Sequence, residues 1–266
     1  MKVTGLVRVG RNVRDLDSAV AFYREALGFQ PVGTAVDDVL LADVLGVERV
    51  RWLRMRVGAM EIELSECFPA GAAYPASLRA NDLVFQHIAI VTTDITAASG
   101  RVLRVGAEAI SSFGPVHLPV SAGDVSAFKF RDLEGHPLEF LQFPDGAGRL
   151  EAGFDHSAIC VSNVEGSVGF YGELGLVLGS RQVNQGREQD ALDGLAGVSV
   201  DVVALLPARP TPHVELLGYR APISGTAAGY APGDICADRL IFGAAEGGLR
   251  MRRDPDGHVI LIDGRG

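Results

Sequence analysis

The chain has 266 residues, 47% of them hydrophobic, and a net charge of −9 from 24 Lys and Arg residues against 33 Asp and Glu residues. This length is enough for about two domains, each with a hydrophobic core. The negative charge disfavours nucleic acid and anionic membrane surfaces as partners. Arginines interrupt the N-terminal segment at positions 8, 11 and 14, and no stretch approaches about 18 apolar residues. We therefore expect no signal peptide, no membrane span and a cytoplasmic location.

The predicted elements of the N-terminal segment follow each other as strand, helix and three strands. Alternating apolar residues at Val7 and Val9 predict the first strand. The helix is predicted from one continuous apolar face, formed by Ala19, Phe22, Tyr23, Ala26 and Leu27. Three further strands are expected at residues 30–35, 52–57 and 60–65. A short helical crossover is expected at 39–47, with a counterpart at 191–198.

Two segments of the chain occur twice. The segment "VRDLDSAVAFYREALGF" at 13–29 returns as "VSNVEGSVGFYGELGLV" at 161–177, and "RDLEGHPLEFL" at 131–141 returns as "RDPDGHVILID" at 253–263. These repeats divide the chain into four units, at 1–70, 80–146, 151–220 and 227–266. The fourth unit is too short for a helix and three strands, so we expect it to keep its first strand and its last hairpin.

The order and spacing of these segments resemble the vicinal oxygen chelate superfamily, which includes glyoxalase I, methylmalonyl-CoA epimerase, extradiol dioxygenases and bleomycin-resistance proteins. The segments that carry the resemblance are "DLDSAVAFYREALGF", "HIAIVTTDI", "HSAICVSNVEGSVGFYGELGL", "DLEGHPLEFLQFP" and "DPDGHVILID". The resemblance implies an α+β fold in which four βαβββ modules, the fourth shortened, form two half-open β-barrel-like sheets with helices outside. In chain order, the units make a first glyoxalase-like domain at 1–146 and a second at 151–266.

In proteins of this family the metal ligands come from the first and last strands of each unit. Carried over to this chain, these positions hold His87 and Glu139 in the second unit and His156 and Glu215 in the third. The first and fourth units have Arg8, Glu63, Arg239 and Leu261 there. A complete set of ligands arises only if the second unit pairs with the third and the first with the fourth. We then expect one metal site, and a remnant in the other barrel with an Arg8–Glu63 ion pair.

Two imidazoles and two carboxylates suit one divalent ion, which could be Ni, Co, Zn, Mn or Fe(II). Two unpaired buried carboxylates are costly, which also favours a cation beside them. The resemblance implies a lyase or isomerase of glyoxalase or epimerase type. In such an enzyme the metal stabilises an enolate or enediolate of a substrate that chelates through two oxygens. Either Glu139 or Glu215 would be the catalytic base.

Four other polar residues are candidates for the substrate pocket. His213 lies two residues before Glu215 and therefore faces the same side of its strand. His117 lies in a loop that is expected to cover the site. Asn184 and Arg187 belong, with Gln189, to a polar stretch that is expected either at the mouth of the barrel or in a solvated connection.

Two histidines and three cysteines are expected to have no role in the site. His136 and His258 follow the turn glycines of the repeated hairpins, where solvated side chains are expected. Cys67, Cys160 and Cys236 are far apart in the sequence, which favours reduced, buried thiols.

Two alternative functions remain open. A ferrous extradiol ring-cleaving dioxygenase uses two histidines and one carboxylate, but the resemblance places part of that set in the fourth unit, where Arg239 and Leu261 stand. In a metal-free binding or resistance protein, the histidines and glutamates would only hydrogen-bond each other. In each case the expected partner is a small molecule, and the chain is expected to be a monomer or a homodimer.

Overall fold

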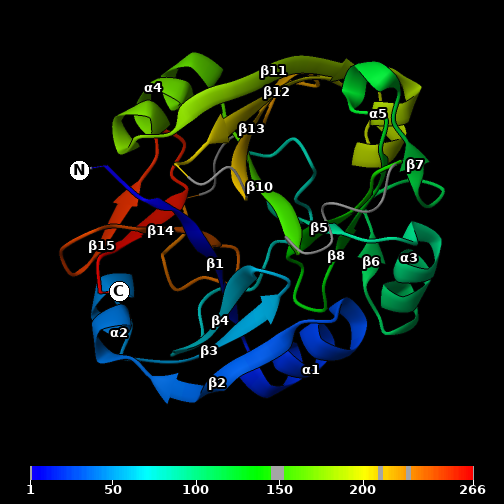
Figure 1. Ribbon diagram of the computed structural model, residues 1–266. Helices are drawn as coiled ribbons and strands as arrows, with labels where there is room; N and C mark the ends of the chain where they lie inside the picture. The colour runs from blue at the N-terminus through cyan, green and yellow to red at the C-terminus, as the bar shows by residue number, and fades with distance from the viewer. Residues whose placement is uncertain (1, 145–152, 209–211, 226–228, 266) are drawn as a thin grey trace.

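The computed structural model describes residues 2–144, 153–208, 212–225 and 229–265. These residues form two open β-sheets with helices around the outside of the strands (Figure 1). This architecture confirms the predicted α+β fold with half-open, barrel-like sheets. Among the described helices, none is long and apolar enough to cross a membrane.

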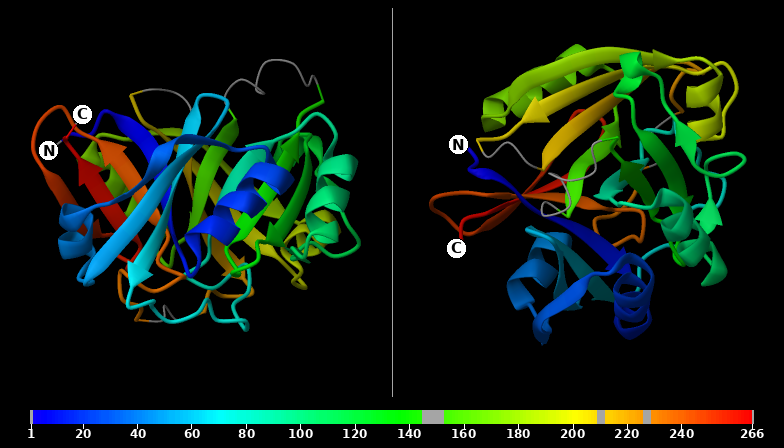
Figure 2. Two further views of the ribbon diagram at one scale, coloured as in Figure 1. Left: turned by 90° about the horizontal axis from the view of Figure 1, so that it is seen from below. Right: turned by 45° about the vertical axis from the view of Figure 1, so that its right-hand side comes forward.

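The first sheet combines strands of the first and fourth units, in the order β15–β16–β14–β1–β4–β3–β2. Strands β1 and β14, blue and orange in Figure 2, lie side by side and pair antiparallel, with Val9 opposite Leu240. The strands of this sheet are β1 (Gly5–Val13), β2 (Gln30–Asp37), β3 (Arg49–Val57), β4 (Met60–Phe68), β14 (Arg239–Gly243), β15 (Leu249–Arg253) and β16 (Val259–Asp263).

The second sheet combines strands of the second and third units, in the order β11–β12–β13–β10–β5–β9–β8–β6, with β7 beside β8. Here β5 and β10 pair antiparallel, with His87 opposite Ala158. The strands are β5 (Gln86–Val91), β6 (Glu108–Ala109), β7 (Val116–His117), β8 (Ser126–Arg131), β9 (Pro137–Gln142), β10 (Phe154–Cys160), β11 (Val177–Gln185), β12 (Ser199–Leu206) and β13 (His213–Ala221).

The units therefore pair in the way that brings the complete set of predicted ligands into one sheet. The fourth unit consists of β14 and the hairpin β15–β16, as predicted for the shortened unit. Each sheet contains strands from both 1–146 and 151–266, so the division into two domains in chain order stays a prediction. The boundary residues 146, 151 and 227 lie outside the described residues.

The helices begin at side-chain caps that are visible in the sequence. Asp15, Asp38, Asp94 and Asn163 precede the first four helices, and each side chain accepts a hydrogen bond from a backbone N–H three residues later. The first helix buries the predicted face, including Phe22. The five α-helices of the described residues are α1 (Leu16–Leu27), α2 (Val39–Leu45), α3 (Ile95–Arg104), α4 (Val164–Leu174) and α5 (Arg187–Asp193), and a 3-10 helix spans Val120–Ala122.

The second crossover helix was predicted at 191–198, and this prediction is wrong in position. Helix α5 spans Arg187–Asp193 and ends at Gly194, which adopts the left-handed conformation with φ 62°. A glycine in this conformation commonly ends a helix, because it has no Cβ to clash with the backbone. The sequence "ALDGLAG" therefore contains the end of the helix and not its start.

The two hairpin histidines are buried, which corrects the prediction of solvated turns. Nε2 of His136 lies 2.9 Å from the carbonyl oxygen of Asn12, and Nε2 of His258 lies 2.8 Å from that of Cys160. Asn12 is on β1 and Cys160 is on β10, so each hairpin packs against the first strand of a unit in the other sheet. The two histidines are buried because they lie where the two sheets meet.

The two segments that occur twice in the sequence, a helix and a hairpin, contact each other in both copies. Tyr23 of α1 donates a hydrogen bond to Asp132 at 2.9 Å, and Tyr171 of α4 donates one to Asp254 at 3.1 Å. Each aspartate also accepts a hydrogen bond from the backbone N–H of the hairpin histidine four residues later. The same contact thus joins the first unit to the second and the third unit to the fourth.

We expect the stabilising contribution of His136 to decrease as the pH rises. Burial opposes its positive charge, but Asp238, 2.8 Å from Nδ1, and Asp132 raise the pKa of His136 above its usual value of 6.5. The contribution is therefore complete below about pH 6.5 and is lost as the pH rises through the raised pKa. Urea unfolding of the wild type and His136→Gln from about pH 5.5 to 9 should give a free-energy difference that narrows with pH.

A difference that stays constant or widens with pH would contradict this ion pair. In an Asp238→Asn background, the effect of His136→Gln should lose most of its pH dependence, because the main partner of the charged ring is gone.

Candidate metal centre

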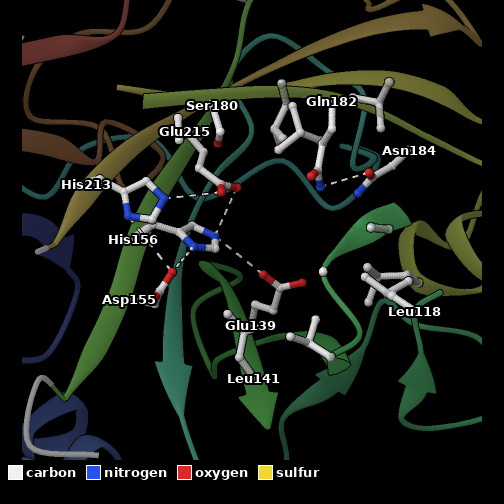
Figure 3. Close-up of a pocket in the computed structure, with 18 of the residues that line it drawn as sticks. Leu118, Glu139, Leu141, Asp155, His156, Ser180, Gln182, Asn184, His213 and Glu215 are labelled. Atoms are coloured by element: carbon white, nitrogen blue, oxygen red, sulfur yellow. Dashed lines mark hydrogen bonds and ion pairs between the residues drawn. The ribbon is translucent and has the colours of Figure 1, made fainter. Parts of the chain in front are cut away.

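The four predicted ligands lie on one face of the second sheet. His87 is on β5, Glu139 on β9, His156 on β10 and Glu215 on β13, and these strands are neighbours in the order β13–β10–β5–β9. Figure 3 shows Glu139, His156 and Glu215 pointing toward one another. Residues that are far apart in the sequence therefore meet because the first strands of the second and third units pair.

The distances between the potential ligand atoms are short. Nε2 of His87 lies 3.2 Å from Oε2 of Glu139. Nε2 of His156 lies 3.7 Å from the same oxygen and 3.4 Å from Oε2 of Glu215. Adjacent ligands that are each about 2.1 Å from one ion lie roughly 3 Å apart, so only small movements would be needed to bind one. The ligand atoms of His87, Glu139 and His156 lie within 4.8 Å of one another, and Glu215 joins this group through His156.

The ring of His156 has a buried nitrogen without a well-aligned hydrogen bond. Its Nδ1 lies 3.2 Å from Oδ2 of Asp155, which fixes the orientation of the ring. Its Nε2 faces the two glutamates and has no hydrogen-bond partner among the described residues. A histidine that binds a metal typically has a carboxylate or carbonyl on its other ring nitrogen. These residues therefore fit a divalent ion by their chemistry and by the free position on His156.

The protonation of the predicted ligands follows from burial and from their mutual contacts. Burial lowers the pKa of His87, so its ring is neutral. Burial acts to raise the pKa values of Glu139 and Glu215, but contacts with His156 outweigh it and lower both, that of Glu139 strongly. For His156, burial acts against the charge, yet Glu215 and Asp155 hold its pKa well above the usual value. Both carboxylates are therefore ionised, as metal ligands must be.

His213 and Asp155 extend this cluster. Nε2 of His213 lies 3.3 Å from Oε1 of Glu215, and its Nδ1 lies 3.9 Å from Oδ2 of Asp155. Asp155, His156 and His213 form a second group whose ligand atoms lie within 4.8 Å of one another. Sequence reasoning missed Asp155, although it directly precedes a predicted ligand in "FDHSAIC". On a regular strand, adjacent residues face opposite sides of the sheet, so Asp155 was expected to point away from His156. Strand β10 has a bulge between Phe154 and His156, and a bulge breaks this alternation.

A cavity of about 500 Å³ lies beside the predicted ligands, a size suitable for a small molecule. Its lining includes the four predicted ligands and two of the predicted pocket residues, His213 and Asn184. In Figure 3, Ser180, Gln182 and Asn184 of β11 face the cavity from the side opposite Glu139. Much of the remaining wall is apolar and includes Leu118, Leu141, Leu192, Val200 and Val202.

The other two predicted pocket residues do not line this cavity. Arg187 is the first residue of α5, and its side chain is 93% exposed and pairs with the adjacent Glu188. It points outward because the opposite side of α5 is the buried one. His117 of β7 has a side chain that is 64% exposed and contacts Asp124. Contact of either residue with a substrate is therefore not supported by its position.

Sequence reasoning also missed Lys129, which is buried in the wall of the cavity. It lies on β8, directly opposite Glu139 of β9. Its ammonium group pairs with the buried Asp193 at the end of α5, at 2.7 Å. The signal was present in "FKF", where a charged residue interrupts a strand that is otherwise apolar.

Two of the four equivalent positions in the first sheet hold arginines, Arg8 and Arg239. Nη2 of Arg239 lies 3.3 Å from Oε1 of Glu63 and donates a hydrogen bond to Ser65 at 2.9 Å. The predicted Arg8–Glu63 ion pair is present, with Nε 3.6 Å from Oε2. Leu261 packs in an apolar cluster. The charge of the buried Glu63 is thus balanced by the protein itself.

Comparisons with known proteins agree with this fold. Residues 8–121 match the family described as the Glyoxalase/Bleomycin resistance protein/Dioxygenase superfamily. No curated protein matches the sequence. This match bears out the expected resemblance to the vicinal oxygen chelate superfamily over residues 8–121.

Three solved structures cover nearly the whole chain. Glyoxalase I from Zea mays is 14% identical with a TM-score of 0.59, covering 97% of this chain and 91% of that one. A glutamate-to-glutamine mutant of the same maize enzyme is 15% identical with a TM-score of 0.60, covering 97% and 92%. A candidate dioxygenase from Bacillus subtilis is 14% identical with a TM-score of 0.62, covering 100% and 87%. At these identities the similarity establishes the fold and not the reaction.

We expect Arg239→Met to destabilise the protein by about 3 kcal/mol, because it removes one partner of a buried ion pair and leaves the Glu63 carboxylate less compensated. Urea unfolding measures the change. The matched control is Arg250→Met on the exposed side of β15, which should change the free energy of unfolding by less than about 0.5 kcal/mol. Equal effects of the two substitutions would show that the buried guanidinium is not needed to balance Glu63.

Proposed function

We propose that this chain binds one divalent metal ion between His87, Glu139, His156 and Glu215, and that it is a lyase or isomerase of glyoxalase or epimerase type. One observation carries the proposal. The buried Nε2 of His156 faces two ionised carboxylates without a well-aligned hydrogen bond, while Asp155 holds the other ring nitrogen. The family that residues 8–121 match includes glyoxalases, which is consistent with this class of reaction.

When bound, a divalent ion supplies positive charge that stabilises an enolate or enediolate of a substrate with two adjacent oxygens. Glu215 is the better placed of the two carboxylates to act as the base. Its side chain is 18% exposed against 6% for Glu139, and it borders the cavity at the edge of the compact ligand group. Glu139 contacts both His87 and His156 and therefore holds them in position. His213 contacts Oε1 of Glu215 and orients that carboxylate.

A second candidate function is a ferrous extradiol dioxygenase. The compact group of His87, Glu139 and His156 consists of two histidines and one carboxylate, the set that non-haem ferrous oxygenases use. The two candidates differ in whether Glu215 is a ligand or base, or only a neighbour of the site. Consumption of oxygen with catechol by the Fe(II)-loaded protein would favour the dioxygenase.

We expect the protein, purified without an affinity metal, to contain about one divalent ion per chain by elemental mass spectrometry. His87→Ala and His156→Ala should each lose the ion, because each removes an imidazole ligand. His117→Ala is the matched control and should keep it, since this histidine is exposed and outside the cavity. If the wild type takes up no Ni, Co, Zn, Mn or Fe(II) even after incubation, a metal-free binding protein becomes the better interpretation.

We expect the metal-loaded protein to exchange the carbon-bound protons of hydroxyacetone with deuterium from D₂O, as followed by NMR. Glu215→Gln should slow this exchange by about 100-fold or more, because an amide cannot act as the base. Metal content is measured on the same samples, so that loss of the ion is distinguished from loss of the base. Unchanged exchange in a metal-loaded Glu215→Gln variant would rule out Glu215 as the base.

A further inference from the structure

A buried polar cluster lines the cavity in addition to the predicted metal ligands. Nζ of Lys129 lies 2.7 Å from Oδ1 of Asp193. Oδ2 of Asp193 accepts hydrogen bonds from Nε2 of Gln189 at 2.8 Å and from the hydroxyl of Tyr219 at 2.9 Å. Lys129, Gln189 and Tyr219 all belong to the lining of the cavity, and all four side chains are buried. Asp193 thus holds three side chains from β8, α5 and β13 in fixed positions.

Two groups in this cluster have hydrogen-bonding capacity that none of the described residues uses. The ammonium group of Lys129 can donate three hydrogen bonds, and among the described residues it donates one, to Asp193. Its ion pair with Asp193 holds this group in the wall of the cavity. Oε1 of Gln189 is buried and accepts no hydrogen bond within the described part of the chain. Because Nε2 donates to a carboxylate, the amide cannot be flipped, and Oε1 is fixed as an acceptor.

The unused donor of Lys129 and the unused acceptor of Gln189 lie beside the same carboxylate, that of Asp193, and together they indicate which chemical group of a ligand could bind there. A hydroxyl group accepts one hydrogen bond and donates another, so it satisfies both Lys129 and Gln189. A carboxylate cannot donate, and it would lie close to the negative charge of Asp193 and the carbonyl oxygen of Gln189. Lys129 is also the one Lys or Arg in the described lining of the cavity, so no further cation is available there to bind an anionic group.

We propose that Lys129 and Gln189 bind a hydroxyl group of the substrate at a position remote from its two chelating oxygens. Lys129 donates to the hydroxyl oxygen, and the hydroxyl hydrogen is donated to Oε1 of Gln189. This inference rests on the proposed function for the location of the chelating oxygens, and it narrows the substrate class to compounds that carry a further hydroxyl. Other polar side chains line the cavity, including Ser180 and Asn184, but Lys129 and Gln189 differ from them because their unused donor and acceptor lie beside one carboxylate.

The test uses 2-oxohexanoate and its 4-hydroxy, 5-hydroxy and 6-hydroxy derivatives, which share two adjacent oxygens and differ in one hydroxyl. Dissociation constants are measured by calorimetry. One hydroxylated compound should bind the wild type at least about tenfold more tightly than 2-oxohexanoate, since a hydrogen bond to a charged group contributes this much. Gln189→Met and Lys129→Met should each abolish the preference. Gln182→Met removes a glutamine elsewhere in the same cavity and should keep it.

The inference is overturned if no hydroxylated compound is preferred, if none of the compounds binds, or if the preference persists in both variants. Gln189→Met retains the Lys129–Asp193 ion pair, so it decides the question even if Lys129→Met does not fold. Metal content is determined on the same samples. A metal-loaded protein without the preference contradicts this inference alone, whereas a metal-free protein with the preference contradicts the proposed function alone.

Discussion

The antiparallel pairing of first strands from different units is the interaction on which the candidate site depends. In the second sheet, β5 pairs with β10, and the rings of His87 and His156 come to a centroid distance of 5.6 Å. The parallel neighbours β9 and β13 then place a glutamate on each side of this pair. None of the four units holds more than half of the set, so the site exists only because two units share one sheet.

The same pairing, made by β1 and β14 in the first sheet, produces a different chemical outcome. Both sheets bury carboxylates on their inner face, and a buried charge needs a partner. In the first sheet Arg239 and Arg8 supply that partner to Glu63. In the second sheet Glu139 and Glu215 face histidines. A histidine ring nitrogen can carry a proton or, after losing it, bind a metal ion. The buried carboxylate of the first sheet is thus balanced permanently by arginines. The carboxylates of the second sheet are balanced by histidines, which a metal ion could also bind.

The repeats predicted the four units and the shortened fourth one, and the family resemblance implied the fold and the residues that meet on the inner face of the second sheet. These features follow from local patterns that recur along the chain. The burial of His136 and His258 could not be predicted in this way, because it depends on which strand of the other sheet packs over each hairpin. The Lys129–Asp193 pair had a visible local signal in the apolar strand, but its partner comes from a helix of another unit. The predictions failed mainly where a side chain contacts a residue that is far away in the sequence.

The contacts made by Tyr23 with Asp132 and by Tyr171 with Asp254 bear on how such a protein can be divided. All four predicted ligands lie in one continuous stretch, residues 80–220, which looks like a separable half of the molecule. Yet the hairpin of this stretch is closed by a tyrosine of the first unit, and its own Tyr171 is used by the fourth. Cutting the chain at those boundaries would leave both polar contacts broken. The half without a candidate metal site therefore supplies contacts that close the other half, which gives a physical reason for keeping both halves of the repeat in one chain.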